Sequence, residues 1–511
     1  MLFSSFGFIF GFLPVTLGGF LFFRHCNAMQ AAKLWLIAAS TVFYGNFIPV
    51  HLLVLGLSTL ANFSLGRLLL RRRSAVILAS GVALNLGVLT VFKYADFIVG
   101  NINVLLGTSL PLAGFILPLA LSFFTFQKIA YLVDVYRGGA PRYSFGDFVL
   151  FVVYFPQLIA GPIVHHRDIM PQIAAMGQRR DVATDLTVGS TAFVIGLFKK
   201  LAIADSLSVY SDSVFGAATG GATPDLLSAW VGVLSFTLQI YFDFSGYSDM
   251  ALGLSRMFGI RLPVNFLSPY KATSIIDFWR RWHITLSEFL RLYLYVPLGG
   301  NRRGLWRRYR NLWIVMLLGG LWHGAGWTFV VWGGLHAFYL SVNHTARSLG
   351  WPRFSGPAGR LAAWLVTMLA VMVAWVFFRA PDGATALRML AGMAGQGGII
   401  LPSAAAALNA LAPVRLDVLG VSFGGLHMLD VTARSQLLWL PAGLVICLCA
   451  PNVADWLRGW NLSLRRDTES GLSAWWLRWQ PTLLWGVAIS LLLAFCVTYQ
   501  QNTAPFLYFQ F

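Results

Sequence analysis

The sequence predicts an all-α protein that crosses a membrane many times. Of its 511 residues, 57% are hydrophobic and only 11% are charged, whereas soluble domains carry about 25% charged residues. The mean hydropathy is +0.69, and apolar runs long enough to span a bilayer recur along the chain. No charged stretch is long enough to fold a soluble domain, so we expect a single membrane domain over residues 1–511.

Candidate spans begin at the N-terminus and number about a dozen. They cover residues 2–23, 31–47, 51–70, 74–92, 116–136, 148–164, 186–203, 226–257, 311–322, 327–343, 361–378, 437–449 and 483–498. Residues 96–106 are shorter and are interpreted as interfacial. Residues 275–298 carry too much charge to face lipid, and residues 383–435 are interpreted as amphipathic or loop structure outside the main bundle.

The net charge of +18 is better explained by topology than by nucleic acid. Lys and Arg gather in short clusters between apolar runs, for example at residues 71–73, 199–200 and 307–308. Cytoplasmic loops of membrane proteins hold such clusters, and anionic lipid head groups attract them. We therefore expect a phospholipid membrane, and no nucleic acid, as a partner.

The stretch NLWIVMLLGGLWHGAGWTFVVWGGLHAFYL, residues 311–340, is apolar yet holds His323 and His336. An ionisable side chain at membrane depth is costly unless it is paired or faces water. Two glycines close behind His323 allow close approach to it and predict two helical arms that meet at residues 324–326. We expect Trp322 and Trp327 to form walls beside His323. A histidine buried among aromatic side chains stays neutral and can accept a proton from a hydroxyl.

A second polar segment is DFWRRWHITLSEFLRLYLYVPLGG, residues 277–300. On one continuous helix, two ion pairs form on one side: Asp277 with Arg281, and Glu288 with Arg291. His283 and Trp282 then lie on the opposite, aromatic side. The charged residues fit a structural re-entrant helix as well as a functional one. For His283 we favour a function, because no carboxylate on its own helix face satisfies it.

Other polar residues stand inside apolar runs. Asp243, in QIYFDFSGYSD at residues 239–249, can line a pathway or anchor arginines of the 277–300 segment. Gln127 and Lys128 can contact a polar ligand or a phosphate, or extend to the membrane interface. His336 is a secondary candidate beside His323.

Several common chemistries are disfavoured. The chain has no H-E-x-x-H zinc motif, no Cys-His pairing, no G-x-S-x-G serine elbow and no P-loop. We therefore expect no metal site. Acyl transfer from a thioester to a hydroxyl needs little more than a base, positioning, and donors for the developing oxyanion.

Five blocks of the sequence resemble the membrane-bound O-acyltransferase family. They are SFFTFQKIAYLVDVYRG (122–138), PQLIAGPIV (156–164), QIYFDFSGYSDMA (239–251), FWRRWHITLSEFLR (278–291) and LWHGAGWTFVVWGGLH (321–336). Within the family they are most similar to the membrane subunits of bacterial alginate and related polysaccharide O-acetylation. The likeness covers nearly the full length, including the chain end PFLYFQF, with core blocks at about 118–345.

The resemblance implies a ring-like helical bundle with re-entrant helices around a central tunnel. It implies that His323, in the Trp-His-Gly block, and His283, in the Arg-Trp-His block, are catalytic. As substrate or tunnel lining we add Trp322, Trp327, Trp282, Ser287, Asp243, Gln127, Lys128 and His336.

The implied activity is transfer of an acetyl group from a cytoplasmic thioester, acetyl-CoA, across the bacterial inner membrane, with no permanently bound cofactor. The implied acceptor is an exported polysaccharide such as alginate, or a separate periplasmic acetyltransferase partner of the SGNH-hydrolase type. One alternative is D-alanyl transfer to a teichoic-acid-type polymer, with an acidic carrier protein docked on the basic cluster at residues 302–308. Another is a secondary transporter with the intramembrane acids as ion sites, against which the lack of an evident inverted repeat argues.

Overall fold

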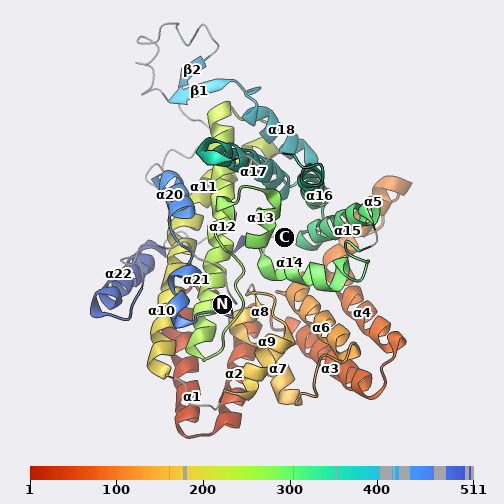
Figure 1. Cartoon of the computed structure of the whole chain (residues 1–511), viewed down its shortest axis with the longest axis vertical. Coiled ribbons are helices and arrows are strands. Elements are labelled where there is room, and N and C mark those ends of the chain that lie inside the picture. The colour runs from red at the N-terminus through yellow and green to blue at the C-terminus, as the bar shows by residue number, and fades with distance from the viewer. Residues whose placement is uncertain are drawn as a thin grey trace.

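The computed structural model describes residues 1–159, 161–176, 181–302, 304–351, 355–402, 417, 421–424, 438–464, 479–500 and 506–507. Helices make up almost all of the regular structure in these ranges, which confirms the all-α prediction. The described strands are β1 (Ile399–Pro402) and β2 (Val421–Gly424), which pair in parallel. They lie at one end of the molecule, at the top of Figure 1.

The first half of the chain forms the following elements, where η marks a π- or 3₁₀-helix: η1 (Gly7–Phe12), α1 (Leu13–His25), α2 (Met29–Gly45), α3 (His51–Arg71), α4 (Ala75–Leu89), η2 (Thr90–Tyr94), α5 (Ala95–Leu106), α6 (Leu121–Tyr136), α7 (Phe145–Val153), α8 (Phe155–Leu158), α9 (His166–Ala174), α10 (Val182–Phe198), η3 (Lys199–Ala204), α11 (Asp205–Thr219) and α12 (Leu226–Met257). The second half forms η4 (Pro269–Lys271), α13 (Ile275–Arg281), α14 (Ile284–Leu290), η5 (Arg291–Tyr295), α15 (Leu305–His323), α16 (Trp327–Ser348), α17 (Gly356–Arg379), α18 (Gly383–Met393), α20 (Trp439–Cys449), α21 (Val453–Trp456), η9 (Arg458–Trp460) and α22 (Leu483–Tyr499).

Six helical stretches in the described ranges are long and apolar enough to cross a membrane. They are Gly7–His25, His51–Arg71, Ala75–Leu106, Val182–Thr219, Leu226–Met257 and Gly356–Arg379. The chain is therefore a multi-pass membrane protein. Six is fewer than the dozen spans expected. Among the remaining candidates, α20 and α22 are short, and α15 begins with a strongly basic turn.

Residues 96–106, expected as a shorter segment apart from the span at residues 74–92, are continuous with that span in the structure. The helix α4 continues through the π-helix η2 into α5, so Ala75–Leu106 is one helical stretch of 32 residues. A π-helical turn inside an α-helix is rare and is often found at functional sites. Here it carries Lys93, the charged residue at the end of a predicted span.

The bundle is held together around α12, which packs against α10 and α11 and runs through the middle of the molecule in Figure 1. Glycines allow the close contact, because a Cβ atom built on Gly246 would lie 2.7 Å from the carbonyl oxygen of Gly196. Buried ion pairs cross the same seam, including Lys199 with Asp249 at 2.6 Å.

Residues 383–435 are only partly as predicted. The helix α18 packs on α11, α12 and α17, so the expectation that it lies outside the main bundle is wrong. It is amphipathic, with Ala386 and Met389 fully buried and Leu387 exposed. The rest of this segment, apart from residues 394–402, 417 and 421–424, lies outside the described residues.

Two residues near the chain end are buried in the bundle. The backbone N–H of Leu507 donates a hydrogen bond to Asp243 at 2.9 Å. The ring of Phe506 lies 4.7 Å from that of Tyr247 and 5.9 Å from that of Phe244, measured between centroids. The block PFLYFQF therefore contributes at least these two residues to the core.

Candidate active site

The hairpin of α15 and α16 places His323 at a break in the chain. α15 ends at His323 and α16 begins at Trp327, which confirms the prediction of two arms that meet at residues 324–326. The helices pack closely because a Cβ atom built on Gly320 would lie 3.2 Å from the Cα atom of Gly333, and closer still to the carbonyl oxygen of Phe329. This packing holds the end of α15 inside the bundle.

The prediction of one continuous helix through residues 277–300 is wrong. α13 ends at Arg281 and α14 begins at Ile284, and between them His283 adopts a left-handed conformation with φ +41°. Buried Asn265 holds this turn: its carbonyl oxygen accepts from the N–H of Ile284 at 3.0 Å, and its Oδ1 accepts from the hydroxyl of Thr285 at 2.7 Å.

Both predicted ion pairs of this segment form all the same, because each stays within one helix or its immediate end. Arg281 lies 2.9 Å from Asp277, and Arg291 lies 3.8 Å from Glu288. All four side chains are at least 30% exposed. The charges therefore lie away from the buried histidine of the same segment.

The structure brings His323 and His283 together. Their ring centroids are 6.4 Å apart, with 61° between the ring planes, and their exposed fractions are 4% and 0%. Trp322 contacts both rings, at 4.9 Å from His323 and 6.1 Å from His283. Two imidazoles from segments far apart in sequence thus share one buried aromatic enclosure.

The walls of this enclosure differ in one respect from the prediction. Trp332 and Phe378 meet the ring of His323 edge-on, at 5.0 and 5.2 Å. Trp327, predicted as a wall, is 63% exposed and donates a hydrogen bond to Asn101 on α5 at 2.8 Å. Trp332 takes its place because it lies on the inner face of α16.

Three further predicted residues lie near the histidines. His336 is fully buried, accepts a hydrogen bond from Trp279 Nε1 at 3.2 Å, and contacts Trp332 at 4.8 Å, so one indole separates it from His323. Trp282 precedes His283 and packs on Trp375. Ser287 lies one turn after His283, and its Oγ is buried with no hydrogen-bond partner among the described residues.

The other predicted lining residues have structural partners elsewhere. Lys128 is fully buried and donates to the hydroxyl of Ser58 at 3.0 Å, so it does not extend to the membrane interface. Gln127 donates to the carbonyl oxygen of Phe151 at 3.1 Å. Asp243 lies 2.7 Å from Lys200, so its expected pairing with an arginine of the 277–300 segment is replaced by a lysine of η3.

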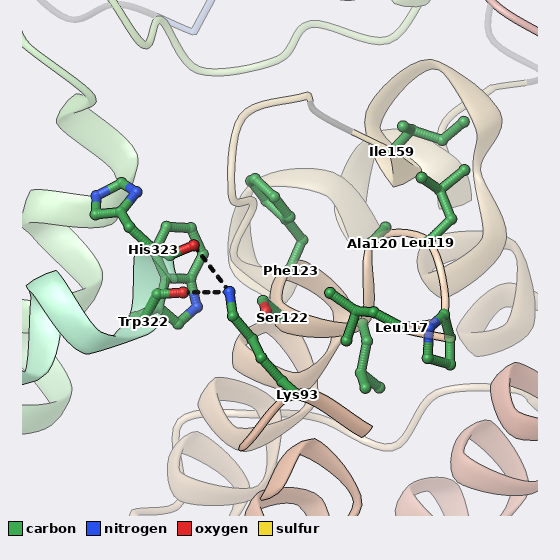
Figure 2. Close-up of a pocket in the computed structure, with 11 residues that line it drawn as sticks. Lys93, Leu117, Leu119, Ala120, Ser122, Phe123, Ile159, Trp322 and His323 are labelled. Carbon is green, nitrogen blue, oxygen red and sulfur yellow. Dashed lines mark hydrogen bonds between the residues drawn. The ribbon is translucent and has the colours of Figure 1, made fainter. Parts of the chain in front are cut away.

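A cavity of about 80 Å³ opens beside the end of α15. It is lined by Trp322, His323, Lys93, Ile159 and residues 117–123, which lead into α6. Figure 2 shows the carbonyl oxygens of Trp322 and His323 turned toward Lys93, while the imidazole of His323 extends away from Lys93. Trp322 lines the cavity, and its indole also contacts the ring of His283.

Lys93 is a site residue that sequence reasoning missed. Its Nζ donates to the carbonyl oxygens of Trp322 at 2.7 Å and His323 at 3.0 Å. The neighbouring Tyr94 donates through its hydroxyl to Leu321 at 2.9 Å. The available signal was a lysine at the end of an apolar run, since charged residues at membrane depth mark functional or pairing positions.

The donor set of the enclosure favours proton transfer. The described residues include no group of three or more His, Cys, Asp or Glu side chains able to hold a metal ion. An imidazole in apolar surroundings favours its neutral form, which has one nitrogen able to accept a proton. The site can therefore supply a general base close to a second imidazole.

Comparison with known proteins gives one family. A model described as MBOAT, the membrane-bound O-acyltransferase family, matches residues 139–378. A peptidoglycan O-acetyltransferase of Helicobacter pylori is 43% identical over 431 residues, which cover 78% of this chain and 81% of that protein. A probable alginate O-acetylase of Pseudomonas aeruginosa is 41% identical over 404 residues, covering 77% and 75%. A teichoic acid D-alanyltransferase of Streptococcus thermophilus is 26% identical over 238 residues, covering 44% and 56%.

Proposed function

Because the chain belongs to the membrane-bound O-acyltransferase family and is therefore an O-acyltransferase, we propose that it moves an acetyl group from a thioester to a hydroxyl of an exported polysaccharide. The observation that carries the proposal is the pair of buried histidines, His323 and His283, whose rings lie 6.4 Å apart beside a cavity that reaches Trp322. Membership of an enzyme family sets the transporter alternative aside.

His323 acts as the general base in this proposal. It accepts the proton of the attacking hydroxyl while the hydroxyl oxygen forms a bond to the thioester carbonyl carbon. The tetrahedral intermediate then collapses: the C–S bond breaks, and the leaving thiolate takes the proton from His323 to form the free thiol. His283 assists by binding or orienting the acceptor next to the first ring. The surrounding indoles exclude bulk water, which limits hydrolysis of the thioester.

The acyl donor in the proposal is acetyl-CoA, and the acceptor is a polymer hydroxyl or a partner protein that passes the acetyl group on. The names of the relatives point to peptidoglycan and alginate as polymer classes. The D-alanyltransferase is less similar and covers less of the chain, which favours acetyl transfer over D-alanyl transfer. We place the protein in the bacterial inner membrane, with a separate periplasmic SGNH-type acetyltransferase as its partner.

The test is acetylation of the polymer in cells that carry a deletion of this gene and a plasmid-borne variant. We expect His323→Ala to lower acetylation by about 100-fold or more, the range of a lost general base. His51→Ala is a matched control, since His51 is also buried but lies at the start of α3, outside the enclosure. Wild-type acetylation by His323→Ala at equal protein abundance would show that the base is another residue.

The donor is identified with purified protein in proteoliposomes. Radiolabel from acetyl-CoA should appear on the acceptor, and label from a D-alanyl carrier protein should not. Label from the carrier protein alone would replace the acetyl assignment with D-alanyl transfer.

A further inference from the structure

The end of α15 is capped by side chains from another helix. A helix leaves its last four carbonyl groups without partners inside the helix, and the chain leaves α15 abruptly, with Gly324 in an extended conformation at φ −157°. Three of those carbonyl oxygens receive donors from two consecutive residues of η2. Tyr94 donates to Leu321, and Lys93 donates to the two residues that follow.

We propose that Lys93 and Tyr94 are positioning residues that set the direction of the His323 imidazole for catalysis. The inference rests on the proposed role of His323 in acyl transfer. Lys93 holds the carbonyl group of His323, and in Figure 2 the imidazole extends to the opposite side of the backbone. Fixing the carbonyl therefore directs the ring toward Trp332 and His283, which it contacts.

Charge strengthens this contact. An ammonium group at a helix C-terminus interacts favourably with the partial negative charge of the exposed carbonyl groups. A lysine has three N–H donors, and two of them meet carbonyl oxygens of α15. The carbonyl groups also explain how a lysine is accommodated within the apolar stretch Ala75–Leu106, where an unsatisfied charge would be costly.

The geometry also separates positioning from substrate contact. Lys93 lines the cavity, so a direct role in binding the donor is the competing explanation. A residue that binds the donor changes KM, whereas a residue that orients the base changes kcat. A displacement of about 1 Å in a catalytic group can cost about 100-fold in rate.

The experiment compares Lys93→Met, Lys93→Arg and Tyr94→Phe with the wild type in proteoliposomes. The matched control is Lys271→Met, because Lys271 donates to the carbonyl oxygen of Ala450 at 2.7 Å, at the end of α20. We measure kcat and KM for the donor, and hydrogen–deuterium exchange of the amides at residues 321–328, which needs no activity.

For Lys93→Met we expect kcat to fall by about 10- to 100-fold with KM unchanged, and faster amide exchange at residues 324–328. Lys93→Arg keeps the charge and the donors and should restore most of kcat. Tyr94→Phe loses one hydrogen bond and should give a smaller change of the same kind. The control Lys271→Met should change neither kcat nor this exchange.

Wild-type kcat and exchange in Lys93→Met would overturn the proposal. A rise in KM alone would overturn it as well, in favour of donor binding. If Lys93→Met does not fold, unchanged kcat and unchanged exchange in Tyr94→Phe, which removes the hydrogen bond to Leu321, overturn it. If the wild type transfers no acetyl group, the proposed function fails, and the exchange measurement still decides whether Lys93 and Tyr94 order the end of α15.

Discussion

Replacing His283 by asparagine separates the chemistry of its imidazole from the backbone conformation that carries it. His283 has φ +41° and ψ +55°, and for most residues the left-handed region costs roughly 1–2 kcal/mol. Asparagine enters this region more readily than other non-glycine residues. His283→Asn therefore keeps the turn between α13 and α14 and removes the ring that faces His323.

The expected change in stability is small. The ring of His283 meets Phe244 edge-on at 4.9 Å, and an aromatic pair contributes about 0.5–1.5 kcal/mol. Relief of backbone strain offsets part of that loss, by up to about 1 kcal/mol. Both side chains are polar and neutral, so the desolvation cost changes little. The free energy of unfolding should fall by about 1 kcal/mol or less.

The expected change in rate is much larger. A misplaced reactant can cost about 100-fold in rate, so loss of the ring that orients the acceptor in His283→Asn should lower kcat by about 100-fold. The assay measures acetyl transfer at saturating donor, together with the thermal unfolding midpoint in detergent. His283→Gln is the control, because glutamine also lacks the imidazole but is less favoured in the left-handed region. It should be as inactive and less stable.

Two results would refute this reasoning. A stable His283→Asn protein that transfers acetyl groups at the wild-type rate would assign His283 to structure alone. A His283→Gln protein more stable than His283→Asn would show that the left-handed turn does not dominate the stability of this position.

Three further outcomes follow from the packing and the charges. Lys200→Met removes an ammonium 2.7 Å from two buried carboxylates and should cost roughly 3–5 kcal/mol, measured by thermal unfolding in detergent. Arg379→Met, whose carboxylate partner is 56% exposed, should cost at most about 1 kcal/mol, and an equal loss in both variants would contradict the burial argument. Trp332→Leu should lower acetyl transfer by more than about tenfold, because it removes an aromatic side chain that packs on the candidate base. Trp327→Leu should change acetyl transfer little. A larger loss in Trp327→Leu than in Trp332→Leu would instead support Trp327 as the wall of the site, as the sequence predicted. The carboxylate of Asp382 accepts a hydrogen bond from the backbone N–H of Thr385 at the start of α18, which lowers the pKa of that carboxyl below the ordinary value of 3.8. The stabilisation of the helix by this carboxylate is therefore present above pH 3.8 and is lost as the pH falls through the lowered pKa. Protection of the amides in the first turn of α18, taken relative to their intrinsic exchange rate at each pH, should therefore fall at pH values below 3.8, and Asp382→Asn should remove this dependence.

The sequence indicated the candidate site because its strongest signals are local. Composition and apolar run length are sufficient to indicate a membrane protein. The glycines after His323 predict a break whatever the partner helices are, because glycine tolerates the extended and closely packed backbone there. The pair Asp277 and Arg281 depends on one helical turn and forms as predicted at 2.9 Å.

The left-handed turn at His283 was not predictable in the same way. Residues 275–298 contain no proline or glycine before Pro297, so local propensity favours an uninterrupted helix. Asn265, from the segment before α13, holds the turn through the backbone of Ile284 and the side chain of Thr285. A tertiary hydrogen bond of this kind overrides the local preference.

The sequence by itself determined the fold class, the break at residues 324–326, and the two histidines as candidates. The tertiary structure alone decided that their rings lie 6.4 Å apart, that Trp332 rather than Trp327 faces His323, and that Lys93 holds the end of α15 from 230 residues away in the chain. The physical reason is the distance along the chain over which each interaction acts. Periodicity, glycine and ion pairs at helical spacing act within a few residues, whereas the partner of a buried ring or a helix end depends on how whole helices pack against one another.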